Sequence, residues 1–161
     1  MIMDRGTTLT ADDLAATPMA RDYDAERGFL SCSRDDSEYD YKVYADGLEA
    51  GITADYFTDP DCKEYFLALQ LADKENEPGF MGAFARVRND FPKKTFMSKV
   101  LLCCDTSASG HKWIERMVKA YKYRKLQGIS LRMSDAVRTA NPTEDPAEHA
   151  ARFDSELTEL I

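Results

Sequence analysis

The residues that could support metal or covalent chemistry are few in this chain. It has four cysteines without a CxxC pair and two histidines far apart in the sequence: Cys32, Cys62, Cys103, Cys104, His111 and His149. A zinc site needs ligands at close, regular spacing. The chain also lacks the GxxxxGK[ST] and GxGxxG loops that bind phosphates. We therefore expect no metal, no cofactor and no enzymatic activity.

Two weaker candidates for chemistry remain. Cys62 could be a nucleophile if a histidine lay beside it, but it falls on the apolar stripe of a predicted helix. We predict that its thiol is buried and unreactive, like that of most cysteines in apolar surroundings. The acidic clusters at residues 35–40 and 75–77 lack the ligand spacing of a calcium loop, so we interpret them as solvated surface charge.

The charge of the chain is unevenly distributed. The formal net charge is −8, but residues 1–110 carry −9, residues 111–138 carry +6 and residues 139–161 carry −5. The basic segment has three readings: contact with a nucleic-acid backbone, docking against an acidic protein surface, or a solvated helix face. An acidic chain with one basic helix favours protein docking. The candidate basic docking face consists of Lys119, Lys122, Arg124, Lys125 and Arg132.

Length and composition indicate a single globular domain with an appendage. The chain has 161 residues, of which 43% are hydrophobic, too many for a disordered chain. The longest apolar run, residues 100–104, is far shorter than the roughly 20 residues of a membrane span. The N-terminus is acidic where a signal peptide is basic and then apolar. We expect a cytoplasmic protein with no membrane association and reduced cysteines.

The apolar residues recur at helical spacing, and no stretch alternates as a strand does. Predicted helices begin at Asp22 and, with an Asp–Pro start signal, at Pro60. Another predicted helix covers residues 38–48, and its inward residues are Tyr41, Tyr44, Ala45 and Leu48. A further predicted helix begins at Pro78 and ends at Pro92, and its inward residues are Met81, Phe84, Ala85, Val87, Arg88 and Phe91. Further predictions are a weak helix at 10–16, a turn at 34–37, a helix at 94–104 and a linker at 106–110.

The C-terminal part predicts a helical hairpin. A long helix over residues 111–140 is stopped by Asn141-Pro142, and a second amphipathic helix starts at Asp145-Pro146. Two such helices joined by a short connection favour antiparallel packing. We therefore predict an all-α protein with a flexible tail (1–21), a compact multi-helix domain (22–110) and a long antiparallel hairpin (111–161).

Three parts of the sequence carry a resemblance to a known family. Residues 24–30 (DAERGFL) resemble the EAE-x-x-(V/F)-L opening of the N-terminal domain of DnaB-type hexameric replicative helicases. Residues 52–66 resemble that domain's L-x-x-x-D-F-Y-x-x-x-H-R-x-I-F segment. Residues 113–126 and 146–160 resemble its linker helix and the short acidic helix that completes the hairpin. The motif positions are Ala25, Glu26, Leu30, Phe57, Lys63 and Phe66.

The resemblance implies a role in DNA replication as a non-catalytic collar. In the family this domain forms oligomers, receives the C-terminal domain of primase and connects to the motor domain. Amphipathic hairpins also leave apolar stripes that need a partner. The residues expected at that contact are Ile114, Tyr121, Ile129, Met133, Phe153, Leu157 and Leu160. The alternative is that these residues pack back on residues 22–110.

The sequence also departs from the family pattern. Cys62 stands where the family has histidine, the V-D-x-x-T-L segment is not visible in residues 74–80, and no ATPase motif follows. We expect either a part of a longer helicase or a stand-alone phage-type replication factor. A third alternative is a DNA-binding protein that uses the basic helix at 111–138.

Overall fold

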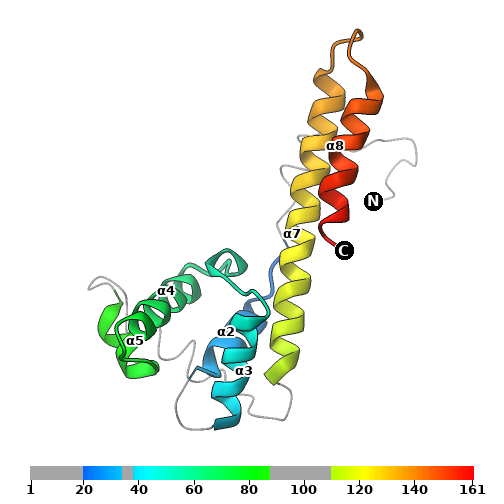
Figure 1. The fold of residues 1–161 in the computed structure, drawn as a ribbon. Helices are drawn as coiled ribbons and strands as arrows, with labels where there is room; N and C mark the ends of the chain where they lie inside the picture. Colours follow the sequence, from blue (N-terminus) through cyan, green and yellow to red (C-terminus); the bar gives the residue numbers. More distant parts are fainter. Residues whose placement is uncertain (1–19, 34–37, 88–109) are drawn as a thin grey trace, which may run out of the picture. The chain divides into compact units, whose positions relative to one another are not determined.

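A computed structural model describes residues 20–33, 38–87 and 110–161, and every element in these ranges is helical (Figure 1). The all-α prediction is confirmed. The elements are α2 (Tyr23–Ser31), α3 (Glu38–Glu49), the 3₁₀ turn η1 (Ala54–Tyr56), α4 (Pro60–Lys74), α5 (Phe80–Arg86), α7 (Gly110–Thr139) and α8 (Pro146–Thr158). The predictions for residues 10–16, 34–37, 88–92, 94–104 and 106–109 lie outside the described residues. None of the described helices is long and apolar enough to cross a membrane.

The chain divides into two compact units, and the division falls inside α7. One unit spans Arg21–Ala120 and is called the globular unit below. The described part of the other consists of Ala20 and Tyr121–Ile161, and it is called the hairpin unit. Each unit is described by itself.

The helix starts of the globular unit follow the sequence signals. The Asp22 carboxylate caps α2 by accepting a hydrogen bond from Ala25 N at 3.1 Å. Asp59 caps α4 in the same way through Asp61 N, with Pro60 in the first turn. The predicted inward faces of both helices form the core: Ala25, Phe29, Leu30, Cys32, Cys62, Tyr65, Phe66, Leu69 and Ala72 are buried.

The predicted inward face of α3 is partly wrong. Tyr44 is buried and Leu48 is half-buried, but Tyr41 and Ala45 are exposed, and Val43 is buried instead. Gly47 lies within the helix because the Phe29 ring occupies the space beside it. A Cβ at Gly47 would lie 2.3 Å from Phe29 Cε2.

The prediction for α5 is also partly wrong. The helix begins at Phe80 rather than at Pro78, and Met81 is 74% exposed while Ala85 is exposed. The buried residues are Gly82 and Ala83, since α5 packs closely on α4. A Cβ at Gly82 would lie 1.8 Å from Glu77 O, so only glycine fits there. Phe84 is nevertheless half-buried against the core and Val87 is buried, as predicted, so among the described positions the inward face is wrong only at Met81 and Ala85.

The first turns of α7 pack on α2 within the globular unit. Arg116 donates two hydrogen bonds to the Asp22 carboxylate, at 2.7 and 2.8 Å, and its guanidinium lies over the Trp113 ring. Burial acts to raise the pKa of the Asp22 carboxyl, but hydrogen bonds from Arg116 and Ala25 and the charge of Arg116 hold this pKa below its usual value. The Trp113 indole occupies the space beside Gly28, where a Cβ would lie 2.4 Å from Cε2.

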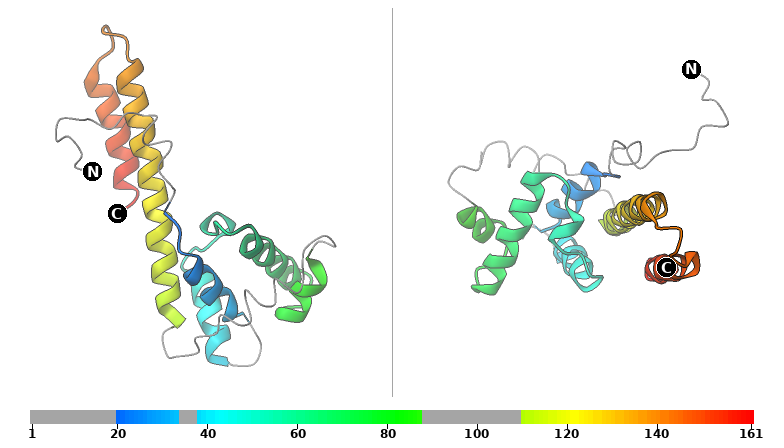
Figure 2. Two further views of the ribbon diagram at one scale, coloured as in Figure 1. Left: turned by 180° about the vertical axis from the view of Figure 1, so that it is seen from behind. Right: turned by 90° about the horizontal axis from the view of Figure 1, so that it is seen from above.

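In the hairpin unit, α8 runs antiparallel alongside α7, as predicted (Figures 1 and 2). Asp145 caps α8 by accepting from Ala147 N at 3.0 Å, with Pro146 in the first turn. Ile129 on α7 and Phe153 on α8 are the buried apolar residues of this unit. Burial of such side chains is the main stabilising contribution to a helical pair.

Two glycine substitutions should have opposite effects on stability. We expect Gly28→Ala to lower the free energy of unfolding of the globular unit by about 2 kcal/mol, because the new methyl group displaces Trp113. Gly128 lies inside α7, and no atom lies within 4 Å of the position that a methyl group would take there. Gly128→Ala should therefore raise stability by up to about 1 kcal/mol through helix propensity. Urea unfolding followed by Trp113 fluorescence and by circular dichroism measures both, and equal effects would contradict the packing at Gly28.

Candidate functional site

The apolar residues predicted to meet a partner occupy three different environments. Ile129 and Phe153 are buried within the hairpin unit, whereas Met133 and Leu157 line a groove on it. Tyr121 and Leu160 are half-buried. Ile114 belongs to the globular unit and packs on its core. Among the predicted residues, Met133 and Leu157 are thus the pair that the structure brings together at a surface.

A stripe along α7 adds residues that sequence reasoning missed. Its members recur at alternating spacings of three and four residues, as the a and d positions of a coiled coil do. We call this stripe the seam: Tyr123, Leu126, Ser130, Met133, Val137 and Ala140. Tyr123, Leu126 and Val137 remain 52%, 39% and 66% exposed. The heptad spacing of these residues is the sequence signal that could have identified the stripe.

A groove of about 530 Å³ lies between the end of the seam and α8. Met133, Val137 and Ala140 form one side of it, and α8 contributes the other. The α8 side and the connecting loop supply Asn141, Pro142, Glu144, Pro146, His149, Ala150, Phe153, Asp154 and Leu157. The groove is mainly apolar, with acidic residues at its rim, so it can hold large apolar side chains from a partner.

The five residues of the predicted basic docking face are not equally available for contact with a partner. Arg124 is buried and donates a hydrogen bond to Ala20 O at 3.1 Å. Arg132 forms an ion pair with Glu156 at 2.7 Å. Lys119, Lys122 and Lys125 are exposed. Three lysines therefore remain as candidate contacts for an acidic partner.

The family-motif positions lie in the globular unit and are mostly core residues. Ala25, Leu30, Phe57 and Phe66 are buried, and the Phe57 and Phe66 rings are in contact with centroids 4.7 Å apart. Lys63 is exposed. These positions support the fold rather than a surface site.

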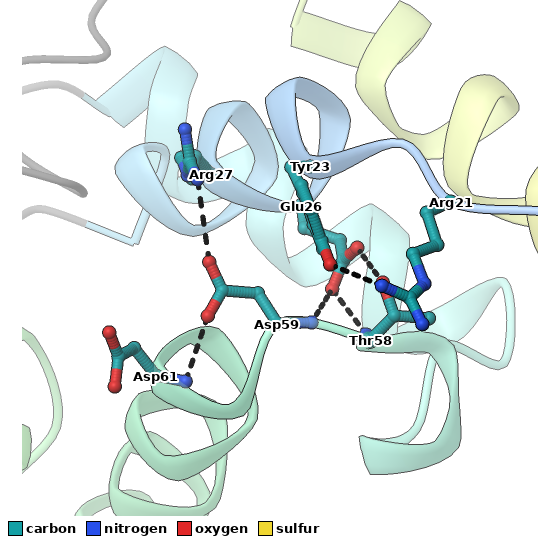
Figure 3. Close-up of polar contacts among 7 residues, drawn as sticks. All are labelled: Arg21, Tyr23, Glu26, Arg27, Thr58, Asp59 and Asp61. Carbon is teal, nitrogen blue, oxygen red and sulfur yellow. Dashed lines mark hydrogen bonds and ion pairs between the residues drawn. The ribbon is translucent and has the colours of Figure 1, made fainter.

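Glu26 is the motif position with a polar role. Its side chain is buried, with 2% of its surface exposed, and its carboxylate accepts hydrogen bonds from Thr58 N, Thr58 Oγ1 and Asp59 N (Figure 3). The next residue, Arg27, forms an ion pair with Asp59 at 3.5 Å. Adjacent residues of α2 thereby fix the segment that leads into α4.

Cys62 has the environment of a core residue. Burial raises the pKa of its thiol far above the usual value, and the nearby carboxylates of Asp59 and Glu26 raise it further. The thiolate is the nucleophilic form, so we expect this thiol to react slowly. Within the described ranges, no three His, Cys, Asp or Glu side chains gather in a way that could hold a metal ion.

Replacing the Glu26 carboxylate should strongly destabilise the globular unit. We expect Glu26→Gln to lower its free energy of unfolding by about 2–3 kcal/mol, since an amide nitrogen would face backbone donors inside the protein. Glu49→Gln is the matched control on the exposed end of α3, and it should change stability by less than about 0.5 kcal/mol. Urea denaturation compares the two variants; similar small changes would show that the buried bonds contribute little.

The buried thiols should resist alkylation in the folded protein. Cys32 and Cys62 are both buried, and Cys32 Sγ donates a hydrogen bond to Gly28 O at 3.4 Å. We expect iodoacetamide to leave them unmodified under native conditions and to modify both in urea, as measured by peptide mass spectrometry. Rapid native labelling of Cys62 would instead support the nucleophile reading.

Among the comparisons with known proteins, only the comparison of structures found a match. No protein-family model matches the chain, and no curated protein matches its sequence. The crystal structure of the N-terminal domain of DnaB helicase from Mycobacterium tuberculosis matches with a TM-score of 0.68 and 18% sequence identity. The match covers 88% of this chain and 99% of that chain. The chain therefore has the fold of a DnaB helicase N-terminal domain, as the sequence motifs predicted.

Proposed function

We propose that this chain is a non-catalytic assembly and partner-docking domain of a replicative DNA helicase, acting in DNA replication in the cytoplasm. The observation that carries the proposal is the match of its fold to the N-terminal domain of DnaB helicase over 88% of the chain. The motifs at residues 24–30 and 52–66 point independently to the same domain.

Self-association is the first part of the proposed role. Supporting it are the exposed seam of α7 and the apolar groove beside it. Exposed apolar surfaces of this kind usually mark interaction sites in proteins. Among the predicted contact residues, Met133 and Leu157 are the candidates that face such a surface, whereas Ile129 and Phe153 hold the hairpin together.

Docking of other replication proteins is the second part. The family resemblance implies the C-terminal domain of primase and the helicase motor domain as partners. In the hairpin unit, the exposed lysines Lys122 and Lys125 offer a basic surface to an acidic partner, and Lys119 is exposed in the globular unit. The same lysines, with exposed Tyr123, favour single-stranded DNA binding as the second candidate function.

The proposal predicts an oligomer. In sedimentation velocity at high micromolar concentration, we expect the chain to form dimers or larger species. In calorimetry, we expect it to bind the C-terminal domain of the primase encoded in the same genome. Met133→Asp should weaken self-association at least about tenfold, since it places a charge in the apolar groove. Met81→Asp is the matched control, because Met81 is exposed in the globular unit.

A monomer that binds no primase domain would contradict the proposed function. If that monomer bound single-stranded DNA with an affinity that falls steeply with salt, the DNA-binding reading would replace it. Equal effects of the two methionine substitutions would remove the groove from the self-association surface.

A further inference from the structure

Two side chains of α7 bind Ala20 within the hairpin unit. Gln127 Oε1 accepts a hydrogen bond from Ala20 N at 3.0 Å, and Arg124 Nη1 donates one to Ala20 O at 3.1 Å. Arg124 and Gln127 are three residues apart, so they lie on one face of the helix. Arg124 is buried, and a buried guanidinium requires hydrogen-bond acceptors. We call this pair the clamp, because together the two side chains hold both backbone polar groups of a single residue.

The clamp indicates the direction in which the chain runs along α7. Two residues after Ala20, the Asp22 carboxylate accepts hydrogen bonds from Arg116, which lies about two helical turns before Arg124. The contacts therefore move toward the C-terminal end of α7 as the residue number falls from 22 to 20. Continued in the same direction, the chain that precedes Ala20 reaches the part of α7 that follows Gln127.

That part of α7 has a row of residues on the face that carries the clamp. Its members recur at spacings of four, three and four, and we call them the row: Gln127, Leu131, Ser134 and Arg138. Leu131 and Ser134 are half-buried, and exposed Arg138 pairs with Asp135 at 2.8 Å. Ile129, which is buried in the pairing with α8, lies about 160° around the helix from Gln127. The row and α8 therefore occupy different faces of α7.

The sequence that precedes Ala20 suits the row in length, polarity and charge. Residues 1–19 contain six large apolar residues and carry a net charge of −2, whereas residues 121–138 carry +4. An extended chain advances about 3.3 Å per residue and a helix about 1.5 Å, so these residues can span about four times the length of the row. Leu14 can thus reach Leu131, and Asp12 and Asp13 can reach Arg138.

We propose that residues 1–19, which we call the strap, bind along the row of the same chain, with the clamp holding their end against α7. The strap then covers Leu131 and brings its aspartates near Arg138. This inference is independent of the self-association proposed above, because the row and the seam share no residue. Since the strap and the helix carry opposite charges at an exposed surface, rising salt releases the strap. A partner of α7 therefore meets the row only after this release.

Disulfide cross-linking in the full chain tests where the strap lies. With Thr17→Cys and Ser134→Cys together, mild oxidation should give an intramolecular disulfide, which peptide mass spectrometry identifies. It should form at least about fivefold faster than with Thr17→Cys and Lys125→Cys, because binding raises the effective concentration at the row. Lys125 is the matched control: it is exposed on the same helix, about 160° around it from Gln127. The chain with Thr17→Cys alone accounts for pairing with the natural cysteines.

Substitutions at Gln127 test the part of the clamp. Gln127→Leu removes the acceptor of Ala20 N, whereas Gln127→Glu keeps an acceptor oxygen there. We expect Gln127→Leu to speed amide hydrogen exchange at Ala20 at least about fivefold and to slow the cross-link between positions 17 and 134. Gln127→Glu should leave both close to the parent values, as should Gln70→Leu, an exposed control on α4. Circular dichroism verifies that each variant is folded.

Charge reversal tests the attraction between the strap and α7. Arg138→Glu should slow the cross-link between positions 17 and 134 about threefold, and adding Asp12→Lys and Asp13→Lys should restore most of the rate. High salt should slow it in the parent charge background as well.

The outcomes separate this inference from the proposed function. Equal cross-linking rates at positions 134 and 125, or rates that ignore salt and both charge reversals, overturn the strap. A disulfide-linked dimer as the main product would place the strap on a second copy and overturn binding within one chain. Because the expected disulfide is intramolecular, a chain that is monomeric in sedimentation contradicts self-association and leaves the strap standing.

Discussion

The buried carboxylate of Glu26 is the interaction on which the globular unit depends. A charge removed from water must be satisfied by hydrogen bonds, and Glu26 accepts three of them from Thr58 and Asp59. Asp59 in turn caps α4 and pairs with Arg27 on α2. The Asp59–Pro60 pair sets where α4 begins, and the bonds from Thr58 and Asp59 to Glu26 hold that start against α2.

Local sequence signals predicted the helix starts well, because each signal acts within a few residues. The Asp–Pro pairs at residues 59–60 and 145–146 cap α4 and α8 in the structure as their chemistry requires. The inward faces of α3 and α5 were predicted less well. There the packing depends on close approaches to two glycines, of the Phe29 ring to Gly47 and of the Glu77 carbonyl to Gly82, which the periodicity of large residues does not report. The burial of Glu26 was equally hidden, since nothing local distinguishes it from exposed acids.

For the candidate contact residues too, the sequence pattern predicts which residues are apolar but not which of them are buried within the hairpin. Sequence periodicity treated all apolar residues of the hairpin as one class. The structure separates Ile129 and Phe153, which α7 and α8 bury between themselves, from Met133 and Leu157, which remain at a surface groove. The seam follows a period of three and a half residues, and its C-terminal part borders the groove beside α8, whereas Tyr123 and Leu126 remain exposed. Only the position of α8 separates the buried residues of α7 from those that stay at the surface.

The segregation of charge in the hairpin contributes little to its stability. Ion pairs at an exposed surface, such as Arg132 with Glu156, contribute little to folding because water and salt screen them. The burial of Ile129 and Phe153 contributes more to the pairing of α7 with α8. A basic helix beside an acidic one nevertheless leaves each hairpin with two complementary surfaces. Such surfaces disfavour like-to-like contacts and favour a partner that presents the opposite charge at each position. The net charge of −8 conceals this arrangement, which becomes visible when the charge is assigned to individual helices.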